Sequence, residues 1–140
     1  MAEFTANAIQ NVSLNQNVLF TDTPVCGNCS IVHRDGSGLI TLRGITNQCR
    51  ARFKVFFSGN IAIPTGGTVE AISLGIGING EAVASSNMII TPAAVEQFWN
   101  VASAIYIDVP SGCCSQISVI NTSAQAIDIQ NANLIVERVA

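Results

Sequence analysis

The chain has 140 residues, the length of one ordinary domain, and this predicts a single domain over residues 1–140. Hydrophobic residues make up 49% of the chain and charged residues only 11%, against about 25% charged residues in a typical soluble domain. A monomer would lack the charges to cover its surface, so we expect part of that surface to be buried against a partner. The six Lys and Arg residues form no basic run, which argues against nucleic-acid binding. No apolar run approaches the roughly 18 residues of a membrane span, which argues against membrane insertion.

The first residues carry few signals. Residues 1–7 lack the basic start and the apolar core of a secretory signal, so we expect no such signal there. We expect residues 1–10 to form a flexible N-terminal arm ahead of the first strand.

From there on, apolar residues recur at every second position, which is typical of β-strands. Residues 72, 74, 76 and 78 are Ile, Leu, Ile and Ile, interleaved with Ala, Ser and Gly, and Asn79-Gly80 after them predicts a two-residue hairpin turn. Residues 92–101 are expected to form a loop with room for one helical turn. The other segments with this alternation are 39–42, 52–57, 104–109, 116–120, 126–129 and 132–139. The pattern predicts an all-β fold, a jelly-roll β-sandwich of about 8–10 antiparallel strands.

The order of these segments resembles the C1q/TNF-like trimeric jelly-roll family in its bacterial and phage versions. The resemblance covers roughly residues 10–140 and includes an opening strand at 15–20 and a corner at 107–112. The remaining matching segments are 33–42, 50–59, 72–87 and 132–139. The resemblance implies a homotrimer displayed on a surface. Two features depart from the family: there is no collagen-like Gly-x-y stalk, and the five cysteines are unusual.

The strand alternation also predicts which side chains face a neighbouring subunit. Phe53, Val55 and Phe57 should fill the core with the apolar residues of 72–78. Phe56, Tyr106 and Ile135 have the opposite parity and are the candidate trimer interface, and Gly75 and Gly77 would permit close approach of a neighbour. Core or interface packing is the favoured interpretation of Phe98 and Trp99, and a binding surface is the alternative.

The sequence has no recognisable catalytic constellation, so we expect no enzyme activity and no cofactor. His33 is the single histidine, and a polar position in the turn before Gly36 explains it better than a catalytic base does. The acidic residues are scattered one by one and indicate no paired-carboxylate or calcium site.

The five cysteines are the one constellation that remains open: Cys26, Cys29, Cys49, Cys113 and Cys114. They could form one or two disulfides, a cluster of unpaired thiols, or a zinc site at Cys26, Cys29 and Cys49. The odd number leaves one cysteine unpaired within a chain. Because Cys49 would start the strand next to the loop that holds Cys26 and Cys29, we expect these three to lie near one another.

The composition and the resemblance together predict a trimeric structural protein of a phage particle or prophage. Its partners would be copies of itself and capsid or tail proteins. The alternative is a bacterial surface adhesin head that binds a glycan or a protein receptor. The ligand and the attachment partner are not specified by any motif.

Overall fold

The computed structural model describes residues 1–25 and 29–140. This part of the chain is almost entirely β-structure, with one short 3₁₀ helix, η1 (Ala84–Ser86). The strands are β1 (Ala2–Ala6), β2 (Gln10–Val12), β3 (Asp22–Val25), β4 (Ile31–His33), β5 (Ile40–Arg43), β6 (Arg50–Ala62), β7 (Ile72–Ile78), β8 (Glu81–Ala82), β9 (Met88–Ile90), β10 (Trp99–Pro110), β11 (Cys114–Asn121) and β12 (Ile127–Arg138). None of the helical structure in these ranges is long and apolar enough to cross a membrane.

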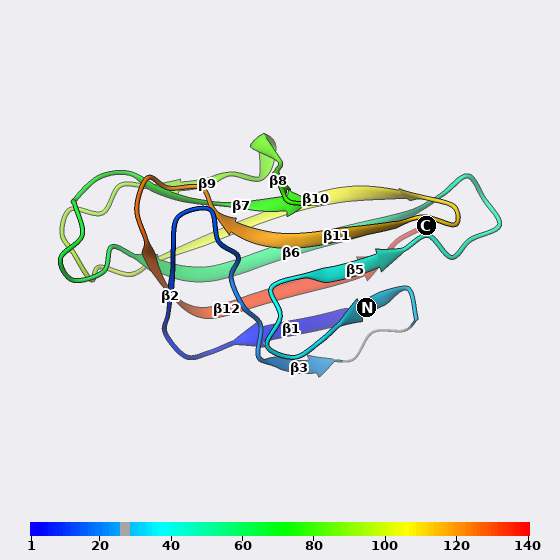
Figure 1. Cartoon of the computed structure of the whole chain (residues 1–140), viewed down its shortest axis with the longest axis horizontal. Helices are drawn as coiled ribbons and strands as arrows, with labels where there is room; N and C mark the ends of the chain where they lie inside the picture. The colour runs from blue at the N-terminus through cyan, green and yellow to red at the C-terminus, as the bar shows by residue number, and fades with distance from the viewer. Residues whose placement is uncertain (26–28) are drawn as a thin grey trace.

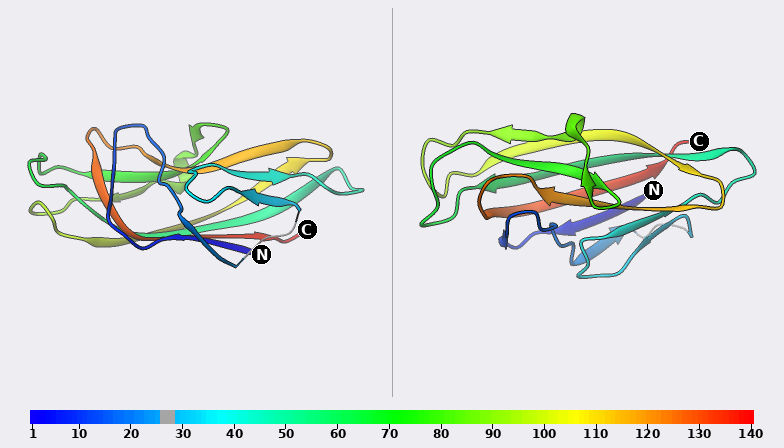
Figure 2. Two further views of the ribbon diagram at one scale, coloured as in Figure 1. Left: turned by 60° about the horizontal axis from the view of Figure 1, so that its bottom comes forward. Right: turned by 45° about the horizontal axis from the view of Figure 1, so that its top comes forward.

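The strands form two antiparallel sheets that pack face to face (Figures 1 and 2). The first sheet has the order β10-β6-β12-β1-β3, with β2 also pairing with β12. The second sheet has the order β4-β5-β11-β7-β8, with β9 also pairing with β7. Both termini lie in the right-hand half of the sandwich in Figure 1. The predicted jelly-roll sandwich is therefore confirmed.

The core lies between the sheets and follows the predicted parity. Phe53, Val55 and Phe57 of β6 are fully buried, and so are Ile72, Leu74 and Ile76 of β7. They belong to one cluster to which strands of both sheets contribute. Since alternate side chains of a strand point to opposite faces, the alternation alone placed these residues correctly.

The expected flexible arm at residues 1–10 is wrong. Residues 2–6 form β1, which pairs with β12 on one side and with β3 on the other. Ala2, Phe4 and Ala6 are buried. The alternation of apolar and polar residues in Ala-Glu-Phe-Thr-Ala is that of a half-buried strand, and it orders this segment inside the first sheet.

The expected opening strand at residues 15–20 is also wrong. This segment crosses between the sheets as a loop with one isolated bridge, Asn17 to Ile120. Val18 and Phe20 are nevertheless buried, so the segment adds side chains to the core without joining a sheet. Of the expected loop at residues 92–101, residues 92–98 form a loop without a helical turn, whereas residues 99–101 already belong to β10.

Gly75 and Gly77 do not provide space for a neighbouring subunit. A Cβ on Gly77 would lie 2.4 Å from Cδ1 of Ile120, and one on Gly75 would lie 3.4 Å from Thr122 Cγ2. The segment that includes η1 also folds back over β7, where Ser86 Oγ accepts a hydrogen bond of 2.8 Å from Ile76 N–H. The chain's own side chains occupy the space that these glycines leave.

The predicted hairpin turn joins β7 and β8. Asn79 has φ 52° and Gly80 has φ 88°, the positive values that a type I′ turn requires. Replacing Gly80 with valine should destabilise the protein by about 1–2 kcal/mol, because the left-handed backbone conformation is unfavourable by this amount for a residue with a Cβ. Thermal unfolding measures the effect, with Ser85→Val as a control in the nearby exposed segment. Equal melting temperatures for wild type and Gly80→Val would contradict the turn assignment.

Candidate functional site

The three candidate interface residues lie together on the outer face of the first sheet. Phe56 of β6 is directly opposite Ile135 of β12, and Tyr106 of β10 is opposite Lys54, one position along the same face of β6. Phe56 and Ile135 are half-buried, whereas Tyr106 is 65% exposed. Ala104, across from Phe56 on β10, is exposed and keeps this face flat. We call this surface the outer face.

A cleft follows the outer face toward the end of the sandwich that holds the termini. It has a volume of about 430 Å³ and is lined by Arg52, Tyr106, Asp108, Val139 and Ala140. A second hollow of about 230 Å³ adjoins it at Arg52 and Ala140, and its other lining residues are Gln48, Cys49 and Arg50. We call the two hollows together the arginine cleft.

Two guanidinium groups in this cleft share one carboxylate. Arg52 donates two hydrogen bonds to Asp108, from Nε to Oδ1 at 2.8 Å and from Nη2 to Oδ2 at 3.2 Å. Arg50 Nε lies 3.2 Å from Asp108 Oδ2. The hydrogen bond from Arg52 lowers the pKa of the Asp108 carboxyl below its ordinary value, and the positive charges of Arg52 and Arg50 add to this effect. Asp108 is therefore ionised at neutral pH, and the group of three carries one excess positive charge.

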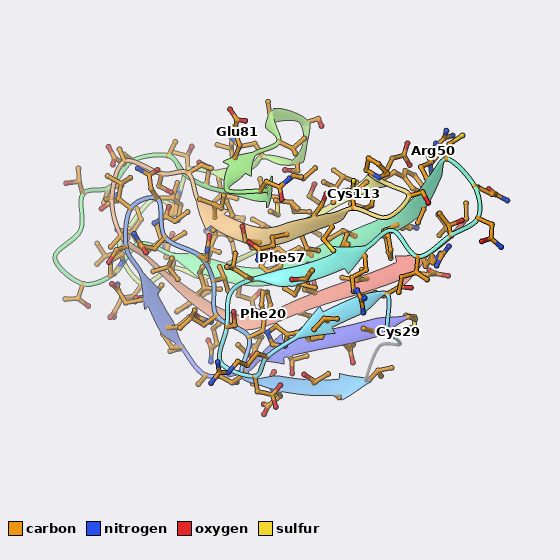
Figure 3. All side chains as sticks on the ribbon, turned by 45° about the vertical axis from the view of Figure 1, so that its right-hand side comes forward. Phe20, Cys29, Arg50, Phe57, Glu81 and Cys113 are labelled. Atoms are coloured by element: carbon orange, nitrogen blue, oxygen red, sulfur yellow. The ribbon has the colours of Figure 1, made fainter. Side chains whose placement is uncertain are left out.

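The same end of the sandwich holds the cysteines in the described residues. Cys49 precedes β6, Cys113 lies in the turn before β11, and Cys114 begins β11 opposite Arg43. Their loops are tied together, since Cys49 O accepts a hydrogen bond from Ser111 N–H at 3.0 Å and Cys113 O accepts one from Gly44 N–H at 2.9 Å. The Arg43 side chain donates to Cys29 O at 3.3 Å. Figure 3 shows Cys29, Arg50 and Cys113 toward this end.

Cys29, Cys49, Cys113 and Cys114 are exposed and unpaired. The structure contains no disulfide among these four. Cys26 lies outside the described residues, so a bond or a zinc site that includes it stays a prediction. Within residues 1–25 and 29–140, no three His, Cys, Asp or Glu side chains are arranged to hold a metal ion.

Exposed thiols should react without unfolding. We expect Cys29, Cys49, Cys113 and Cys114 each to be alkylated by iodoacetamide in the native protein, with the site of modification identified by peptide mass spectrometry. Thiols are accessible and reactive when exposed and inert when buried. If one of these four cysteines reacted only after denaturation and reduction, it would not be free and exposed in the native protein.

Phe98 and Trp99 lie at the opposite end, before and at the start of β10. They are 39% and 54% exposed, so packing in the subunit core is excluded as their role. The loop that precedes them is held to the β6–β7 loop by a hydrogen bond of 2.7 Å from Glu96 N–H to Ile63 O and by a second one between Thr65 and Glu96 side chains. The candidate binding surface is thus far from the arginine cleft along the strands.

His33 is buried, not a polar turn residue as expected. Its side chain is 1% exposed, and its ring lies 4.6 Å from the ring of Phe4, centroid to centroid. Nε2 is 2.9 Å from Ser37 O, so one ring nitrogen is held by a main-chain carbonyl. Nδ1 has no hydrogen-bond partner among residues 1–25 and 29–140 and lies 3.9 Å from Asp35 Oδ1. The aromatic packing gives His33 a structural role.

No family model matches this chain, and no curated protein sequence does. Solved structures do match it. The globular domain of the zebrafish complement 1qA protein aligns with a TM-score of 0.62 and 9% identity, over 96% of this chain and 94% of that one. The Eiger TNF of S. frugiperda aligns with a TM-score of 0.71 and 12% identity, over 99% of this chain and 91% of that one. The fold is a C1q/TNF-like jelly roll. The PRD1 vertex protein P5 has the same architecture at a TM-score of 0.51 and 12% identity, over 99% of this chain and 96% of that one.

This C1q/TNF-like sandwich contains one feature that sequence reasoning missed. The arginine cleft combines Arg50 and Arg52 of β6 with Asp108 of the neighbouring β10. The two arginines are separated by one residue in a strand, which places them on one face. That spacing in the sequence indicated a pair of arginines on one face. It did not indicate Asp108, which is 56 residues from Arg52 and becomes its neighbour only through strand pairing.

Proposed function

We propose that the chain is a non-enzymatic structural and binding module that assembles as a homotrimer in a virion, as a capsid decoration, head-fibre or tail-tip protein of a phage or prophage. The outer face carries this proposal. It brings Phe56, Tyr106 and Ile135 onto neighbouring strands of a C1q/TNF-like jelly roll. Apolar side chains that gather on the surface of neighbouring strands are typical of an interaction site.

Threefold symmetry requires a second surface on the same chain. A cyclic trimer is closed by heterologous contacts, in which one patch of a subunit meets a different patch of the next. The border where β9 packs beside β10 offers such a patch. Ile89 there is 64% exposed and Trp99 is 54% exposed. We propose that this border covers Phe56 and Ile135 on the outer face of the neighbouring subunit and leaves Tyr106 at the edge of the contact, with a total buried area above about 2,000 Å².

Light scattering tests the assembly. The wild-type chain should show about three times its mass of 14.7 kDa at micromolar concentration, and Phe56→Asp should shift the population to single subunits. A charge buried without a partner at an interface costs several kcal/mol, enough to separate the subunits. Val32→Asp serves as the control, because Val32 is an exposed apolar residue of β4 in the second sheet. A stable wild-type monomer would overturn the trimer.

The location needs a separate experiment. The virion proposal draws support from the fold shared with the PRD1 vertex protein. Mass spectrometry of particles purified from a lysed culture should detect the chain at a constant ratio to the major capsid protein. The alternative is a bacterial adhesin head that binds a surface glycan or protein, and the exposed Phe98 and Trp99 favour it. Surface labelling of intact cells, with no signal in purified particles, would support the adhesin over the virion component.

A further inference from the structure

We propose that the arginine cleft binds a carboxylate-bearing sugar, such as a uronic acid residue of a glycan. This proposal gives the binding module of the proposed function a ligand class, but the site lies within one subunit. It therefore does not depend on the trimer.

The cleft has charge available for a ligand. Asp108 engages Arg52 through Nε and Nη2 and Arg50 through Nε. The other guanidinium nitrogens of both arginines have no hydrogen-bond partner among the described residues. The side chains of Arg50 and Arg52 are 54% and 39% exposed, so these donors face solvent. A planar guanidinium that presents two parallel N–H groups matches a carboxylate in geometry and charge.

The surrounding residues favour a sugar over a simple anion. Tyr106 lines the cleft and is 65% exposed, so its ring is a free platform for the apolar C–H face of a pyranose. Asp108 is an acceptor for sugar hydroxyl groups, yet it would repel a doubly charged phosphate. Nearby on the outer face, Lys54 and Glu137 are directly opposite each other and balance in charge. The 430 Å³ volume lies in the range of small-molecule sites.

The cleft and the proposed assembly surface meet at Tyr106 but have different centres. Phe56 and Ile135 line a separate hollow with Lys54 and Glu137. Arg50 and Cys49 lie on the other side of Arg52, toward the end of the sandwich. A ligand can thus enter from that end while Phe56 and Ile135 contact a neighbour.

The test titrates the ¹⁵N-labelled full chain with D-glucuronate, and with D-glucose, acetate and inorganic phosphate in parallel. Saturable shifts at Arg52, Tyr106 and Asp108 are expected with glucuronate, with clearly weaker binding of the other three. Arg52→Gln should weaken glucuronate binding about tenfold or more, as expected for the loss of a charged hydrogen bond. Lys54→Gln is the matched control: it removes one positive charge from the same face of β6, outside the cleft, and should bind normally. Arg50→Gln provides a second variant in case Arg52→Gln does not fold.

Cys49 gives an independent readout because it lines the second hollow. Glucuronate should slow alkylation of Cys49 while leaving that of Cys29 unchanged. Equal binding of phosphate or glucose, or no saturable shift with glucuronate, would overturn the proposal. A trimer that fails to bind refutes the sugar site alone, whereas a monomer that binds refutes the trimer alone.

Discussion

Replacing Phe57 with alanine is expected to lower the free energy of unfolding by about 3–5 kcal/mol, the usual cost of removing a buried phenyl ring. Phe57 is fully buried in the middle of β6. Its ring lies 6.5 Å from that of Phe20 in an edge-on arrangement, so the substitution also removes an aromatic contact. Both residues belong to the core cluster and are labelled in Figure 3. Urea unfolding followed by circular dichroism at fixed protein concentration measures the loss.

Phe56→Ala is the matched control, since it removes the same ring one residue earlier on the opposite face of the strand. Its effect should depend on protein concentration, because association stabilises subunits by mass action. The effect of Phe57→Ala on the subunit core should persist at every concentration. Equal, concentration-independent losses for both variants would show that Phe56 is a core residue and would remove the basis for the outer face as an interface.

This contrast between neighbouring residues explains why the core could be predicted from the sequence. In a strand with one face buried, the period of two assigns every side chain to a face, so Phe53, Val55 and Phe57 were placed without knowledge of the fold. The turn at Asn79-Gly80 was equally local, because the positive φ angles that it needs are a property of those two residues.

The wrong predictions came from segments whose structure depends on distant partners. The opening strand at residues 15–20 was expected from the family resemblance. The main chain of Asn15, Gln16 and Val18 does form hydrogen bonds with β11, but the only bridge is the isolated one at Asn17, and the segment is a loop. Residues 2–6 are a strand because β12, at the other end of the sequence, provides a pairing partner. The periodicity of a segment does not show which distant strand it pairs with. The composition of a short terminal segment does not show whether a sheet offers it a free edge strand.

One part of the candidate site could likewise be predicted from the sequence, and another part could not. The parity of β6, β10 and β12 predicted that Phe56, Tyr106 and Ile135 avoid the core, and strand pairing then placed them side by side. The arginine cleft required the register of β6 against β10, which sets Arg52 opposite Asp108. Register is decided by the whole sheet, so this cluster was visible only in the structure.

The hydrogen bonds of the buried Asn121 side chain also form only in the folded chain. Replacing Asn121 with leucine is expected to destabilise the protein by about 3 kcal/mol or more. Its side chain is fully buried at the end of β11. Nδ2 donates to Val12 O at 3.0 Å and to Gln125 O at 2.9 Å, and Oδ1 accepts a hydrogen bond of 2.9 Å from Ser123 N–H. Leucine has a similar size, but it leaves these main-chain groups unpaired, and each unpaired buried group costs about 1–3 kcal/mol.

Asn100→Leu is the control, because Asn100 makes one exposed hydrogen bond, from its Nδ2 to Asn60 Oδ1 at 3.2 Å. A surface substitution of this kind should change stability by no more than about 0.5 kcal/mol. Hydrogen exchange adds a local readout: in Asn121→Leu, protection should fall first at Ser123, whose N–H donates to Asn121 Oδ1. If Asn121→Leu and Asn100→Leu unfold at the same urea concentration as wild type, the buried amide does not hold β2 and the loop before β12 in place.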